Sequence, residues 1–123
     1  MDLSSFFNAV KKEIITIIVL ALTSIAISVP LTVPGLHTIH DDQQVARLFL
    51  FDQAIKGGQF PPRWVDQLGF GFGYPLFVFY PPFVYFLGEV YHLLGLGYIS
   101  SVKLIFFTSF LASGLAIYLF SKQ

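Results

Sequence analysis

The segment 37–44, with the sequence HTIHDDQQ, contains the residues best suited to chemistry. The carboxylates of Asp41 and Asp42 directly follow the imidazole of His40. Two adjacent carboxylates beside an imidazole can bind a divalent cation such as Mg²⁺ or Mn²⁺, or take a proton from a substrate. Asp41 and Asp42 are therefore candidate catalytic residues and candidate metal ligands, and His40 is a candidate substrate-binding residue.

Asp41 has a second interpretation as a helix cap. It lies three residues before Gln44, a spacing that resembles a capping box, and carboxylates at a helix start complement the helix dipole. The two roles do not exclude each other. A zinc site is not expected, because His37 and His40 have no convincing third ligand and the chain has no cysteine.

Arg47 and Arg63 are the arginines of the polar section that follows this motif. A guanidinium group can hold a phosphate through two parallel hydrogen bonds, so both residues are candidate substrate-binding residues. The alternative for each is interfacial solvation or pairing with Asp52 or Asp66.

Glu89 and His92 are a further ionisable pair in an apolar stretch. They lie three residues apart, so they share one face of a helix. Ionisable residues within membrane segments are functional candidates. We nevertheless expect both to lie near the inner end of a span, where they reach water.

The composition indicates a membrane protein. Of the 123 residues, 55% are hydrophobic and only 11% are charged, against about 25% charged residues in soluble domains. A soluble domain of this size could not bury so much apolar surface. Seven basic and seven acidic residues leave no positive field, so a nucleic acid partner is not expected.

Three transmembrane helices are expected, over 14–34, 82–96 and 103–120. The first lies in a stretch without charged residues from Ile14 to Leu36, and about 20 apolar residues cross the ~30 Å hydrocarbon core. A cleaved signal peptide is the alternative for this stretch, but its apolar run exceeds the usual length in such peptides.

Three prolines set the start of the second helix. Pro75, Pro81 and Pro82 interrupt an apolar run, and a continuous helix across them would lose hydrogen bonds that lipid cannot replace. The helix is therefore expected to start near Pro81 or Pro82. The aromatic segment 68–81 before it is expected to dip to membrane depth.

The loop 35–81 is expected to carry an amphipathic helix over 42–56 that lies in the membrane interface. Gly57 and Gly58 would end this helix. Its apolar face has helical spacing and consists of Val45, Leu48, Phe49, Phe51 and Ile55.

The orientation follows from the lysines beside the first helix. Lys11 and Lys12 nearly abut it, which places the N-terminal segment 1–13 in the cytoplasm. The loop 35–81 then faces the cell exterior. We expect a multi-pass protein of the plasma membrane, with the lipid bilayer as its first partner.

Four segments carry a resemblance to a known family, namely His40-Asp41-Asp42, Arg47, Gly58 to Trp64, and Gly73 to Pro82. Together they resemble the N-terminal part of large bacterial and archaeal multi-pass membrane proteins. That family is labelled "6-pyruvoyl-tetrahydropterin synthase-related", and its members look like GT-C-type glycosyltransferases. The resemblance covers nearly the whole chain. It does not imply pterin chemistry, since a histidine zinc site is missing.

The resemblance implies an all-α membrane fold of which this chain is the N-terminal fragment. It implies a polyprenyl-phosphate sugar donor, and it matches Asp41 or Asp42 to the catalytic acidic residue of the first extracytoplasmic loop. The expected function is therefore the N-terminal module of a membrane glycosyltransferase, inactive without the remaining transmembrane helices of the full-length protein or a partner chain. The alternative is a non-catalytic membrane scaffold or transporter fragment, in which the same residues are caps and interfacial anchors.

Overall fold

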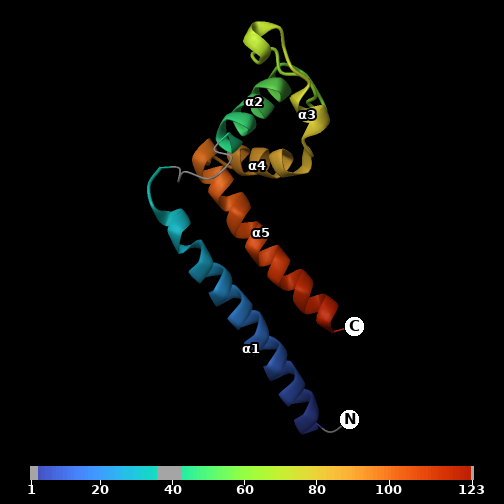
Figure 1. Ribbon diagram of the computed structural model, residues 1–123. Coiled ribbons are helices and arrows are strands. Elements are labelled where there is room, and N and C mark those ends of the chain that lie inside the picture. Colours follow the sequence, from blue (N-terminus) through green and yellow to red (C-terminus); the bar gives the residue numbers. More distant parts are fainter. Residues whose placement is uncertain (1–2, 36–42, 123) are drawn as a thin grey trace. The chain divides into compact units, whose positions relative to one another are not determined.

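The computed structural model of the chain describes residues 3–35 and 43–122 (Figure 1). These residues are helical apart from loops and one isolated β-bridge, which confirms the expected all-α class. The chain divides into two compact units. Unit 1 combines Met1–Pro34 with Phe106–Gln123, and unit 2 is Gly35–Ile105. The elements are α1 (Leu3–Ser28), the 3-10 helix η1 (Val29–Thr32), α2 (Gln44–Lys56), the 3-10 helix η2 (Gly69–Gly71), α3 (Leu76–Phe79), α4 (Phe83–Leu93) and α5 (Tyr98–Ser121).

Two helical stretches are long and apolar enough to cross a membrane. They are Val10–Thr32, which combines most of α1 with η1, and Tyr98–Ser121, which is α5. Their most apolar windows are only 11% and 0% buried, whereas the core helix of a soluble protein would be mostly buried. Exposed apolar side chains over this length suit helices surrounded by lipid.

The expected transmembrane helix over 82–96 is a shorter element. The helix α4 has 11 residues, so it is about 16 Å long and covers roughly half of the ~30 Å hydrocarbon core. Gly95 adopts φ +98°, and the Leu96 N–H donates to the Tyr91 carbonyl at 3.3 Å. This left-handed glycine cap ends the helix. Two candidate spans therefore remain in the described residues, instead of three.

The helix break expected from the prolines is confirmed. The helix α3 ends at Phe79, Tyr80 has extended backbone, and α4 begins at Phe83 with Pro82 as its N-cap. Since Pro82 cannot donate a backbone hydrogen bond, it fits the start of a helix and not its interior.

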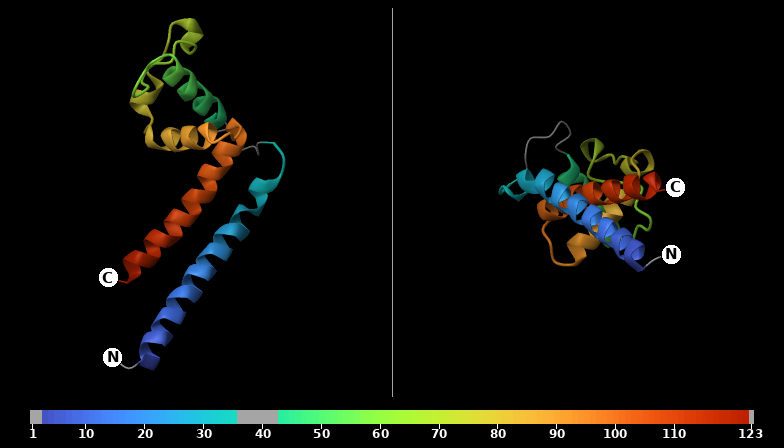
Figure 2. Two further views of the ribbon diagram at one scale, coloured as in Figure 1. Left: turned by 180° about the vertical axis from the view of Figure 1, so that it is seen from behind. Right: turned by 90° about the horizontal axis from the view of Figure 1, so that it is seen from below.

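Unit 1 is an antiparallel pair made of α1 and the C-terminal part of α5, which lie side by side (Figure 2). Glu13 of α1 accepts hydrogen bonds from the Tyr118 hydroxyl and from the Lys122 ammonium. The hydroxyls of Ser24 and Ser28 donate to carbonyls of their own helix, at 2.9 and 2.7 Å. These polar groups are thus satisfied within the helix pair, as an apolar solvent requires.

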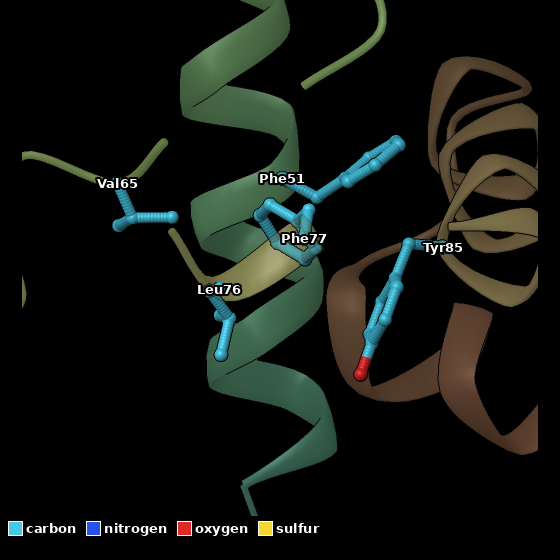
Figure 3. Close-up of a cluster of buried hydrophobic side chains, with 5 residues drawn as sticks. All are labelled: Phe51, Val65, Leu76, Phe77 and Tyr85. Carbon is cyan, nitrogen blue, oxygen red and sulfur yellow. The ribbon is translucent and has the colours of Figure 1, made fainter. Parts of the chain in front are cut away.

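Unit 2 is built around a cluster of buried side chains from α2, α3, α4 and the loop between α2 and α3 (Figure 3). The Phe51 ring of α2 meets the Phe77 ring of α3 edge to face, with centroids 4.9 Å apart. At Gly88, the backbone of α4 lies directly against the side chains of Leu48 and Ile105. A Cβ added there would lie 2.9 Å from an atom of each side chain. The cluster consists of Phe51, Val65, Leu76, Phe77 and Tyr85.

A closed loop precedes α3 in unit 2. Val65 and Tyr74 exchange two backbone hydrogen bonds of 2.9 Å and form the β-bridge that closes it. Gly73 has φ +83°, and a Cβ there would lie 2.4 Å from Nε1 of the Trp64 indole. Only glycine fits at this position, because both the backbone conformation and the contact exclude a side chain.

Candidate functional site

The structure describes two of the five residues proposed for the site. His40, Asp41 and Asp42 lie outside the described residues. Arg47 and Arg63 belong to unit 2 and can be placed. The N-cap of α2 is Gln43, whose side chain makes no capping hydrogen bond, so the helix begins at Gln44 instead of position 42 and the prediction that Asp41 is its N-cap is wrong.

Arg47 is buried at the N-terminal end of α2, with 7% of its surface exposed. Its Nη2 donates to the Tyr80 hydroxyl at 3.2 Å and to the Gln43 side-chain carbonyl at 3.3 Å. The guanidinium carbon lies 4.2 Å from the centroid of the Tyr80 ring, a cation–π contact. Arg47 is therefore held in one orientation, close in sequence to the acidic motif.

Arg63 is exposed and lines an open pocket of about 340 Å³. Among the described residues its guanidinium forms no salt bridge, so the alternative of pairing with Asp66 is not observed. The other lining residues are apolar, and they are Pro61, Pro62, Phe77, Val78 and Pro82. A pocket with one cation and apolar walls can hold an anionic group attached to an apolar chain.

Three of the four segments that carry the resemblance meet in this part of unit 2, and the fourth, His40-Asp41-Asp42, lies outside the described residues. The pocket is lined by both Gly58 to Trp64 and Gly73 to Pro82. The Phe77 N–H donates to the Arg63 carbonyl at 3.3 Å, and the Trp64 ring lies against Gly73. The contact between Arg47 and Tyr80 adds α2 to the same region. Segments distant in the sequence thus form one local structure.

A second polar cluster surrounds Asp52, which the sequence indicated only as a partner for arginine. Asp52 is fully buried, and its Oδ2 accepts hydrogen bonds from Lys56 at 2.7 Å and from the Tyr98 hydroxyl at 2.8 Å. Gln53 adds a longer bond of 3.3 Å. The alternative in which Asp52 pairs with an arginine is not observed among the described residues. The spacing of Asp52 and Lys56, four residues apart on a helix, was the available signal.

Glu89 lies in the same cluster, which corrects the expectation that it reaches water. It is 5% exposed, the negative charge of Asp52 acts on its carboxyl group, and its buried Oε2 has no hydrogen-bond partner among the described residues. His92 is less buried, as expected for a residue near a helix end. Its Nδ1 donates to the Leu96 carbonyl at 2.8 Å, and its ring stacks on that of Tyr98 with centroids 4.1 Å apart.

The two carboxyl groups have opposite pKa shifts. Burial raises the pKa of Asp52, but hydrogen bonds from Lys56 and Tyr98 and the charge of Lys56 outweigh burial and lower the pKa below its ordinary value of 3.8. Burial raises the pKa of Glu89 above 4.5, and the neighbouring negative charge of Asp52 raises it further. Glu89 is therefore the member of the pair that binds a proton more readily.

The described residues contain no cluster of three or more His, Asp or Glu side chains placed to bind a metal ion. The expected cation site at Asp41 and Asp42 lies outside them. Comparisons of the chain with protein-family models, with curated proteins and with solved structures find no match.

Proposed function

We propose that the chain is the N-terminal module of an inverting membrane glycosyltransferase that uses a polyprenyl-phosphate-linked sugar. The observation that carries this proposal is the pocket that the exposed Arg63 lines together with apolar residues. A donor of this class joins a phosphate to an isoprenoid chain, and the pocket offers one partner for each part. The phosphate would bind Arg63, and the first isoprene units would lie against Phe77 and Val78.

In the proposed reaction, a hydroxyl oxygen of the acceptor forms a bond to the anomeric carbon, and the bond from that carbon to the phosphate oxygen breaks. A carboxylate of Asp41 or Asp42 takes the hydroxyl proton or holds a cation that activates the hydroxyl. The phosphate leaves with the electron pair and is stabilised by an arginine.

The acidic motif is close to Arg47 in the sequence, since Asp42 lies five residues before it. We propose that a substrate that contacts the motif also meets the Arg47 guanidinium, which Tyr80 holds.

We further propose that unit 2 lies on the outer face of the plasma membrane, with α2 in the interface and both chain ends in the cytoplasm. The contact of Glu13 with Lys122 brings the start of α1 next to the end of α5. Lys11, Lys12 and Lys122 then lie on one side of the bilayer, as the positive-inside rule favours. The membrane dip of 68–81 remains a prediction.

The non-catalytic scaffold or transporter fragment is the second candidate. It is favoured by the burial of Arg47, whose contacts with Tyr80 and Gln43 would serve packing alone. Under this alternative, no lipid phosphate binds at Arg63.

Binding of polyprenyl phosphate to the full chain in nanodiscs tests the proposal, with the uncharged polyprenol as the matched ligand. We expect the phosphate to bind at least about tenfold more tightly than polyprenol, because one charged hydrogen bond contributes about 1.5–3 kcal/mol. Arg63→Gln should remove this preference, and Arg63→Lys should restore part of it. Equal binding of both ligands would support the scaffold instead.

A further inference from the structure

Asp52 of α2 and Glu89 of α4 meet in the interior of unit 2. Their exposed fractions are 0% and 5%, and the two carboxyl groups lie close enough together for each to shift the pKa of the other. Ionised carboxylates only accept hydrogen bonds, so a bond between two of them requires a proton on one. Within the described part of the chain, Oδ1 of Asp52 and Oε2 of Glu89 are buried and have no hydrogen-bond partner. A single shared proton satisfies these buried atoms.

The neighbouring groups decide which carboxyl group carries the proton. Oδ2 of Asp52 accepts from Lys56 and Tyr98, and such donors stabilise an ionised carboxylate. Glu89 has no comparable donor among the described residues. His92, on its own helix, directs Nδ1 to the Leu96 carbonyl. The proton therefore resides on Glu89 and is donated to Asp52.

We propose that Asp52 and Glu89 form a binding site for one proton, and that release of this proton loosens α2 from α4. Without it, two negative charges would face each other where little water reaches them, and like charges repel most strongly there. The one ammonium group at the site, that of Lys56, already bonds to Asp52. This inference does not depend on glycosyl transfer, although α2 also carries Arg47.

The direction of the pH dependence follows from the shifted pKa. The pKa of Glu89 is raised in the folded chain, so the folded form binds the proton more tightly than the unfolded form. The stability from this site is full below the ordinary value of 4.5, and it is lost as the pH rises through the raised pKa.

Thermal unfolding of the full chain in detergent tests the proton site. Trp64, the only tryptophan, lies in unit 2 and reports its unfolding. We expect the melting temperature to fall by about 5 °C or more between about pH 5 and 9. Glu89→Gln should abolish this fall, because its amide N–H replaces the proton donor. Asp66→Asn, at an exposed carboxylate of the same unit, should keep it.

A melting temperature that does not change with pH in the wild-type chain would overturn the proposal, as would an unchanged fall in Glu89→Gln. A melting temperature that rises when sodium is added at high pH would show that the pair binds a metal cation instead of a proton.

If Glu89→Gln does not fold, infrared spectroscopy of the wild-type chain tests whether the pair holds a proton. The carbonyl band of a protonated carboxyl group should be present at about pH 5 and disappear as the pH rises. Its absence at about pH 5 would contradict the shared proton.

Spin labels measure the loosening directly. The chain has no cysteine, and Ala46 of α2 and Val90 of α4 are both exposed. In the double variant Ala46→Cys with Val90→Cys, the distribution of distances between labels should broaden as the pH rises. In the presence of Glu89→Gln it should stay narrow. A distribution that is narrow at every pH in the wild-type background would refute the loosening of α2 from α4.

Discussion

The hydroxyl of Tyr98 donates a 2.8 Å hydrogen bond to Oδ2 of Asp52, which ties the first turn of α5 to α2. The Tyr98 ring also meets the Phe49 ring edge to face at 5.5 Å. One side chain thus joins a helix long enough to cross the membrane to the helix that carries Arg47. This contact lies within unit 2 and fixes the start of α5 on α2.

Tyr98→Phe should destabilise unit 2 by about 1–3 kcal/mol, because it removes a hydrogen bond to a buried charge and keeps the ring contacts. Denaturant unfolding followed by Trp64 fluorescence measures this change. Tyr74→Phe is the control, since its side chain is exposed and the change should be below about 0.5 kcal/mol. Equal effects of the two variants would show that the Tyr98 hydroxyl contributes nothing.

Gly73→Ala and Gly71→Ala form a matched pair in the closed loop. Both glycines have positive φ, +83° and +89°, so alanine costs about 1–2 kcal/mol of backbone strain at each. Only at Gly73 does a Cβ also meet the Trp64 ring. Gly73→Ala should therefore lower the free energy of unfolding by at least about 1 kcal/mol more than Gly71→Ala does. It should also alter the Trp64 emission spectrum. Identical stability and spectra would contradict the contact.

Lys56→Met should make unit 2 more sensitive to acid. The pKa of Asp52 is lowered in the folded chain, so its stabilisation is present above 3.8 and is lost as the pH falls through the lowered pKa. Removing the ammonium raises that pKa, and the acid unfolding midpoint should move up by about one pH unit. Lys56→Arg should restore the wild-type midpoint. A pH titration of Trp64 fluorescence measures both.

The sequence predicts local features of this fold well. The break at Pro75 to Pro82 and the end of α2 at Gly57 follow from the chemistry of single residues. The cluster of Asp52 and Glu89 was missed, because it depends on two helices packing across a long loop. The length of α4 was also missed, since hydropathy alone does not separate a buried helix from a membrane span.

Membrane topology distinguishes two spans from three. With two spans, single cysteines at Phe7 and Ser121 should react with an impermeant thiol reagent only after the cells are lysed. Cysteines at Gln43 and Gln59 should react in intact cells. Three spans would place position 121 outside, together with position 59. Labelling of positions 43 and 59 only after lysis would reverse the proposed orientation.

Sugar transfer in membranes that hold the remaining helices of the enzyme is the most direct measurement of the proposed function. The variants are Asp41→Asn and Asp42→Asn, since asparagine cannot act as a base. We predict that at least one variant loses about 10²–10⁴ in rate while expression and membrane insertion stay unchanged. Full activity in both variants would contradict the catalytic role of this motif.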